Sequence, residues 1–129
     1  MGKKPGEGLS RRERQIMDAV YRLGEASVAD VQSEIPNAPS YSTVRALMRV
    51  LTEKGHLTHT SQGTRYVYNP TTPREEAQAS ALERVLSTFF DGSPSRAMAA
   101  LIDLSAEDLT DDELDQLEAL IQDARREER

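Results

Sequence analysis

The chain has 129 residues and a net charge of −6, and its hydrophobic content of 37% is enough for one domain or two small ones. It contains no cysteine, which excludes disulfides, thiolate zinc sites and cysteine nucleophiles. No run of about 18 apolar residues predicts a transmembrane helix, and the first residues lack the hydrophobic segment of a signal peptide, so we expect a cytoplasmic protein.

Two short amphipathic helices are predicted near the start of the chain. A capping box at residues 10–13 predicts a helix that continues to about Leu23, where Gly24 ends it. The apolar side chains of this helix recur at helical spacing and define one face: Ile16, Met17, Val20 and Leu23. Ser27 predicts the start of a second helix, which ends near Ile35 before a rigid turn rich in proline.

A third helix is predicted between Ser40 and Gly55. Its apolar residues fall on one face: Val44, Leu47, Met48 and Leu51. The opposite face is unusual for a surface helix, because most of its side chains are small or cationic: Ser42, Arg45, Ala46, Arg49 and Glu53. Small side chains let a helix approach another molecule closely, and arginines at such a face can bind guanine or phosphate.

A hairpin follows this helix. Two short strands, Leu57–Thr60 and Arg65–Tyr68, are predicted to flank a glycine-containing turn at residues 61–64. Arg65 lies near the hairpin tip, where arginine can contact phosphate or the minor groove. Helix, short helix, turn, longer helix and hairpin is the order of a winged helix-turn-helix, in which the second helix of the pair enters the major groove of DNA.

A break at residues 69–73, which contains two prolines, predicts the boundary between a winged-helix domain, residues 1–70, and a second domain, residues 71–129. The charge changes across this break: residues 1–74 carry eleven basic and seven acidic side chains, whereas residues 75–129 carry five and fifteen. A basic part can hold phosphate while an acidic part is repelled by it. We therefore expect DNA binding in the first domain and a different task in the second.

The second domain is predicted to be helical. Its helices run from Pro73 to about Phe90, from Ser93-Pro94 onward, and from a capping box at residues 110–113. Three amphipathic helices bury little surface alone, so we expect them to pair with the same segment of a second chain in a two-fold dimer. The residues predicted to form this dimer interface are Leu82, Leu86, Phe89, Phe90, Leu101, Leu114, Leu117 and Ile121.

Enzymatic and metal-binding functions find no support in the sequence. His56 and His59 are the only histidines, and no third ligand stands at a metal-binding spacing. The acidic run at residues 107–118 lies at a helix start, where acids interact favourably with the helix dipole. There is no phosphate-binding loop, dinucleotide fingerprint or nucleophile elbow. We therefore predict no catalytic residues, no metal and no cofactor.

Several segments together resemble the penicillinase repressor family of bacterial regulators (BlaI/MecI type). They are LSRRERQIMDAVYRLGEASVADV, SYSTVRALMRVLTEKGHL, GTRYVYNP, FFDGS and LTDDELDQLEALI, which span Leu9 to about Ile121. The resemblance implies a homodimer with an N-terminal winged helix and a C-terminal helical dimerisation domain. It also implies repression at palindromic operators with TACA and TGTA half-sites, at β-lactamase or cell-wall stress genes.

Position by position, the resemblance assigns residues to the DNA interface. The matching residues of the recognition helix and of the wing are Ser42, Thr43, Arg45, Ala46, Arg49, Thr64 and Arg65. Such repressors usually act with a membrane protease sensor whose signal leads to cleavage at an Asn-Phe bond in the dimerisation domain. This sequence contains no Asn-Phe pair, and residues 99–103 read AALID instead. The absence of cysteine excludes the copper-sensing cysteine cluster of some relatives.

A protein-interaction module is the alternative, because winged helices also serve as docking domains. The placement of the cations separates the two functions. A DNA-binding domain needs Arg45, Arg49, Lys54 and Arg65 on one surface. A docking module would scatter them and expose apolar patches.

Overall fold

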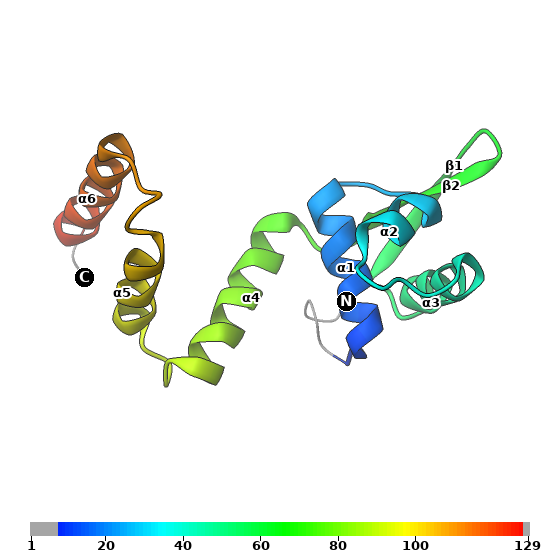
Figure 1. Ribbon diagram of the computed structural model, residues 1–129, viewed down its shortest axis with the longest axis horizontal. Helices are drawn as coiled ribbons and strands as arrows, with labels where there is room; N and C mark the ends of the chain where they lie inside the picture. Colours follow the sequence, from blue (N-terminus) through cyan, green and yellow to red (C-terminus); the bar gives the residue numbers. More distant parts are fainter. Residues whose placement is uncertain (1–7, 128–129) are drawn as a thin grey trace. The chain divides into compact units, whose positions relative to one another are not determined.

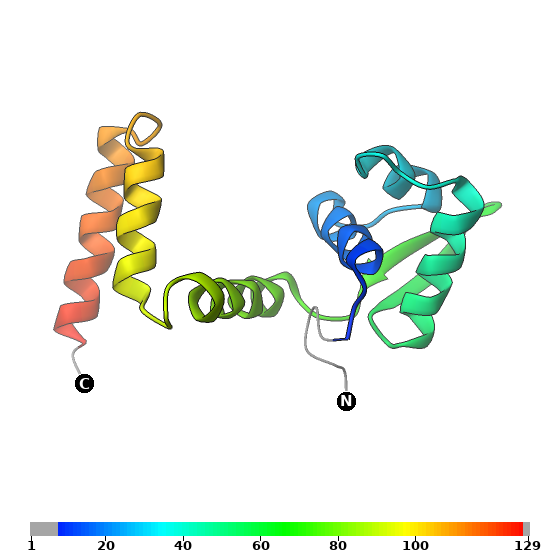
Figure 2. The ribbon, with the colours of Figure 1, turned by 60° about the horizontal axis from the view of Figure 1, so that its bottom comes forward.

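The computed structural model describes residues 8–127, which form six helices and one antiparallel hairpin (Figures 1 and 2). The elements in chain order are α1 (Arg11–Leu23), α2 (Val28–Glu34), α3 (Tyr41–Glu53), β1 (Leu57–Gln62), β2 (Arg65–Pro70), α4 (Arg74–Phe89), α5 (Pro94–Ser105) and α6 (Asp111–Arg126). The chain divides into two compact units between Arg84 and Val85. A functional division near residue 70 stays a prediction.

Local capping explains where the first helices begin and end. The Ser10 hydroxyl accepts from the Glu13 backbone N–H, and the Glu13 carboxylate accepts from the Ser10 backbone N–H at 2.9 Å, so the predicted capping box is confirmed. A second box joins Ser27 to Asp30 at the start of α2. Gly24 ends α1 at a φ of 90°, a backbone conformation that other residues rarely adopt.

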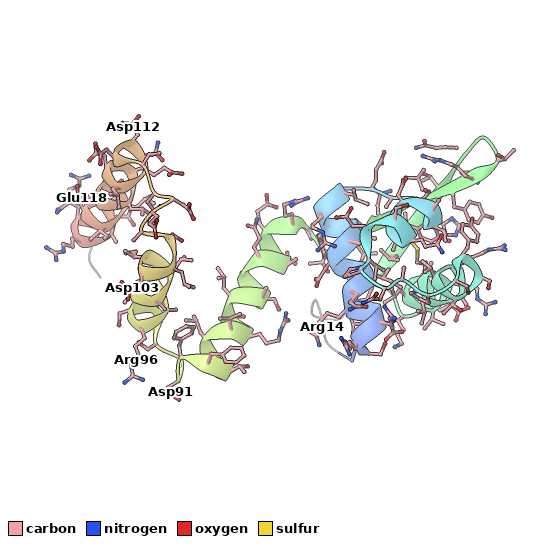
Figure 3. All side chains as sticks on the ribbon, in the orientation of Figure 1. Arg14, Asp91, Arg96, Asp103, Asp112 and Glu118 are labelled. Carbon is pink, nitrogen blue, oxygen red and sulfur yellow. The ribbon has the colours of Figure 1, made fainter. Side chains whose placement is uncertain are left out.

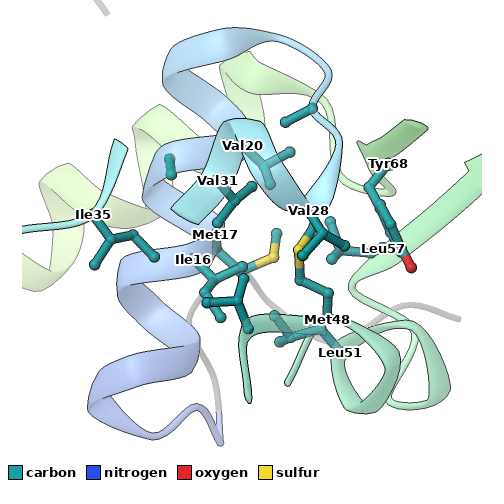
Figure 4. Close-up of a cluster of buried hydrophobic side chains, with 13 residues drawn as sticks. Ile16, Met17, Val20, Val28, Val31, Ile35, Met48, Leu51, Leu57 and Tyr68 are labelled. Atoms are coloured by element: carbon teal, nitrogen blue, oxygen red, sulfur yellow. The ribbon is translucent and has the colours of Figure 1, made fainter. Parts of the chain in front are cut away.

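The core of the first unit lies where α1, α2 and α3 meet the base of the hairpin (Figure 4). Its largest fully buried side chains are Ile16, Val20, Val31, Val44, Met48, Leu51 and Leu57. The predicted inward stripe of α3 is confirmed at Val44, Met48 and Leu51. Leu47 was expected in the same stripe, but it is only half-buried because it packs at the edge of the cluster.

The hairpin, which we call the wing, is longer than predicted. Each strand extends two residues beyond its predicted end, and the register runs from Leu57 opposite Pro70 to Gln62 opposite Arg65. The turn therefore contains only Gly63 and Thr64. The base of the wing is fixed by two backbone bonds, because the Ala26 N–H donates to the Tyr68 carbonyl at 3.0 Å and the Tyr68 N–H donates to the Ala26 carbonyl at 2.8 Å.

Hydrogen bonds hold the segment after β2 against the first unit. The Thr71 hydroxyl donates to the Gly55 carbonyl at 2.7 Å, and the Tyr21 hydroxyl donates to the Thr72 carbonyl at 2.9 Å. The Arg74 guanidinium donates to the Tyr21 carbonyl. Burial raises the pKa of the Tyr21 hydroxyl above its ordinary value.

The second unit differs in its packing. Helix α5 begins at Ser93 and helix α6 at a Thr110–Glu113 capping box, as predicted. Figure 3 shows Asp91 in the turn before α5 and Arg96 in the first turn of this helix, and their side chains form an ion pair of 3.2 Å. None of the residues described after Tyr68 is buried. Within the described residues, no helix has the length and apolar character that crossing a membrane requires.

Candidate nucleic-acid interface

Helix α3 presents its small and cationic side chains to solvent. Its buried residues fix one face of the helix against the core, so the opposite face is exposed along its length. Each predicted recognition residue of this helix is exposed: Ser42, Thr43, Arg45, Ala46 and Arg49. The helix begins at Ser40, whose hydroxyl caps the Thr43 backbone N–H and contacts the Ser42 and Thr43 hydroxyls at 3.2 and 3.0 Å.

A cleft of about 430 Å³ separates this exposed face from the wing. We call it the α3–wing cleft; its walls include Ser42, Arg45, Ala46 and Arg49 from α3 and His59 and Tyr66 from the wing. Two guanidinium groups therefore line one cleft, together with the single carboxylate of Glu53. This charge balance favours an anion.

The wing tip carries the other predicted contacts. Thr64 and Arg65 are exposed and line a second hollow of about 440 Å³, which also includes Tyr41 and Arg45. Arg45 thus borders both hollows, with Arg49 in one and Arg65 in the other. The structure brings these three arginines around the same end of the first unit.

Lys54 lies apart from these arginines. Its ammonium group bonds both carboxylate oxygens of Glu13 at 3.0 Å, and Glu13 is only 5% exposed. The bond from the Ser10 backbone N–H and the contact with Lys54 lower the pKa of Glu13, although burial opposes them. Lys54 lines neither hollow, so its position favours a role in joining α3 to α1.

Three rings of the wing form a cluster that the sequence reasoning missed. The His59 ring stacks on Tyr66 with centroids 4.3 Å apart, and Tyr68 lies 5.3 Å from His59. His59 had been weighed only as a metal ligand, and the described residues contain no group of three possible ligands. Strand alternation was the available signal, since it places positions 57 and 59 on one face of the ribbon.

Most of the predicted dimer residues are exposed apolar side chains. The exposed ones are Leu82, Phe89, Leu101, Leu114, Leu117 and Ile121, while Leu86 and Phe90 are half-buried. Leu104, which is 83% exposed, lies outside the predicted apolar positions, whereas Met98 and Leu120 are apolar positions of their predicted helices and are each more than 60% exposed. Exposed apolar surface of this extent is typical of an interaction site.

Known proteins resemble this chain over most of its length. The family model described as "Penicillinase repressor" matches residues 9–123. A Latilactobacillus sakei protein, described as an uncharacterized 16.5 kDa protein in the ptsI 3′ region, is 27% identical over 105 residues. That match covers 80% of this chain and 72% of the relative.

Solved structures share the fold. The complex structure of hsRosR-S4 has a TM-score of 0.58 at 17% identity, and the match covers 78% of this chain and 93% of that one. The solution structure of the DNA-binding domain of the repressor BlaI has a TM-score of 0.49 at 24% identity, covering 59% of this chain and 93% of that one. The mainly α fold class, a winged helix followed by a helical part, is confirmed.

Proposed function

The chain belongs to the penicillinase repressor family and is a DNA-binding transcriptional regulator; from this premise we propose that it acts as a homodimer on palindromic operators. The proposed half-sites are of the TACA and TGTA type, in genes for β-lactamase or cell-wall stress. Family membership agrees with the prediction that the protein is not an enzyme. Because its proposed partner is chromosomal DNA, we expect the protein to act in the cytoplasm.

The observation that carries this proposal is the grouping of Arg45, Arg49 and Arg65 around α3 and the wing. Short side chains let a recognition helix approach the floor of the major groove closely, and Ser42 and Ala46 supply them on the exposed face of α3. Arginine can then bind guanine through two hydrogen bonds or bind phosphate. We propose that α3 enters the major groove and that Thr64 and Arg65 contact the flanking backbone.

A second copy of the chain is the proposed partner of the exposed leucines. The stripe on α6 repeats at helical spacing through Leu114, Leu117 and Ile121, and a two-fold axis lets one such surface cover an identical one. The charge of this part supports the same assignment, since residues 75–129 hold fifteen acids and five bases and would be repelled by phosphate. Two recognition helices joined in this way would bind two half-sites about one helical turn apart.

Cleavage by a sensor protease has less support in this chain than DNA binding and dimerisation have. The chain lacks the Asn-Phe bond at which relatives are cut, so we propose that any release from the operator uses another bond or another signal.

Fluorescence anisotropy would test the function. A labelled TACA-spacer-TGTA duplex and a scrambled duplex of the same composition would be titrated with the full chain at two salt concentrations. We expect salt-sensitive binding that prefers the palindrome. Equal, weak binding to both duplexes would contradict this operator, and selection of bound sequences from a random pool would identify the true one. No binding to either duplex would favour the protein-docking function.

A further inference from the structure

One face of the wing is buried in the core at its base and borders the α3–wing cleft farther along the ribbon. On β1, Leu57 is 1% exposed at the base of the ribbon, and His59 lies two residues farther on the same face and is exposed. On β2, Tyr68 is paired with His59 and is 5% exposed, whereas Tyr66 is 49% exposed. His59 is therefore the first residue of this face of β1 that can meet a bound molecule.

The surroundings of His59 hold its ring at the wall of the cleft. Tyr66 stacks on the imidazole at an interplanar angle of 21°, and Tyr68 contacts it at a tilt of 59°. The facing wall on α3 carries Arg45, Arg49 and Glu53. A proton on His59 would give the cleft a third cation against one carboxylate.

The shape of the cleft selects one part of a DNA molecule. When a recognition helix lies in the major groove and the wing lies outside it, the strand that borders the groove must pass between the two elements. The volume of about 430 Å³ and the cationic walls suit a phosphodiester and its sugar.

Resting on the function proposed above, we propose that the α3–wing cleft receives the phosphodiester backbone of the bound DNA and that protonated His59 donates a hydrogen bond to a phosphate there. Histidine is the side chain that ordinarily changes charge between about pH 5 and pH 8. Protonation of His59 adds positive charge where the phosphate lies, so the affinity for DNA rises when this ring is protonated. The wing thereby makes operator binding sensitive to pH.

Anisotropy titrations at about pH 6 and pH 8, at constant ionic strength, would test this proposal. The full-length chain would be compared with His59→Gln, which cannot gain the proton, and with His59→Arg, which is charged at both pH values. We expect the wild type to bind about tenfold more tightly at the lower pH. His59→Gln should lose most of this difference, and His59→Arg should bind tightly at both pH values.

Two further readouts identify the group that His59 contacts. The slope of log affinity against log salt should be steeper at the lower pH by about 0.9 for each engaged His59, and this change should vanish in His59→Gln. Phosphate contacts carry no sequence information, so a scrambled duplex should show the same pH dependence as the palindrome. A pH dependence found only with the palindrome would mean that His59 contacts a base, and would overturn the phosphate assignment.

Buried His56 is present in all three proteins, so a difference between them reports on His59. Thermal melting at both pH values would confirm that the exposed substitutions leave the fold intact. An unchanged pH dependence in His59→Gln would overturn the role of His59 alone. A wild-type chain that binds no duplex at either pH would overturn both this proposal and the proposed function.

Discussion

The two units of this chain reach stability by different routes. The first has a core of seven fully buried large side chains, shared by three helices and the base of the wing. The second, from Val85 onward, has well-capped helices but no buried residue among those described. Capping and propensity can specify a helix, whereas a folded unit also requires apolar surface removed from water. From this comparison we propose that the first unit can fold alone and that the second needs a partner to cover its apolar side chains.

Among the substitutions that test this comparison, Leu117→Asp should have the largest effect, on oligomeric state and on DNA affinity. A charge placed in the proposed dimer surface would meet its own copy across the two-fold axis, so we expect a monomer. Affinity for a two-half-site duplex should fall by about 100-fold or more, since each half-site alone binds weakly. Sedimentation would report the mass and anisotropy the affinity. Asp115→Asn, on the same helix, is the matched control and should remain dimeric; a dimeric Leu117→Asp protein would contradict this interface.

Leu51→Ala should destabilise the first unit by about 2–5 kcal/mol, because it leaves a cavity in the closed core. Denaturant unfolding followed by circular dichroism would measure the loss. Leu104→Ala offers the contrasting substitution, since this side chain is 83% exposed. A similar loss in both variants would show that the second unit buries Leu104 in solution, and would place that residue in the dimer interface.

Arg49→Ala should weaken DNA binding by about 1–3 kcal/mol for each half-site without changing the melting temperature. The arginine lines the α3–wing cleft and makes no contribution to the core. Arg96→Ala removes the same charge from the second unit, where the side chain pairs with Asp91, and is the control. Equal affinities of the two variants would remove Arg49 from the interface.

The smallest expected effect is the part of the loss of stability in acid that is due to the Glu13 carboxyl. The pKa of this carboxyl is lowered below the ordinary value of 4.5 by the Ser10 backbone N–H and Lys54. Its contribution to stability is therefore complete above about pH 4.5 and is lost as the pH falls through the lowered pKa. We expect Glu13→Gln to lower the free energy of unfolding at neutral pH by about 1 kcal/mol. The melting temperature of this variant, plotted against pH, should also fall less steeply in acid than that of the wild type.

The pKa of Asp30 is also lowered, by its capping bonds to Ser27. The Glu13→Gln variant should therefore still lose some stability in acid. If the melting temperature of Glu13→Gln falls in acid as steeply as that of the wild type, the Glu13–Lys54 pair does not contribute to stability.

Local signals in the sequence predicted most helix limits, because the bonds that set them span only a few residues. Ser10, Ser27 and Thr110 each cap a helix by bonding a group three residues away. The strands were predicted too short because Ser61, Gln62, Asn69 and Pro70 lack the usual strand preferences, although the register pairs them.

Contacts between distant parts of the chain could not be predicted in the same way. The Lys54–Glu13 pair joins residues 41 positions apart, and nothing near Lys54 in the sequence distinguishes it from a free surface lysine. The placement of His59 opposite Tyr68 depends on the two-residue turn, which the sequence reasoning had made four residues long. The apolar stripes of the second unit were visible in the sequence, but a single chain cannot show what covers them.

The anchoring of the wing has a consequence for how such regulators diverge in evolution. The two backbone bonds between Ala26 and Tyr68 fix the ribbon at its base, and every residue from Thr58 to Tyr66 is exposed. Mutations in this stretch change what the protein touches while leaving its folding largely unaffected. Substitutions in the ribbon alone can therefore change the response of such a regulator to its promoters or to its growth conditions, without any change in the core.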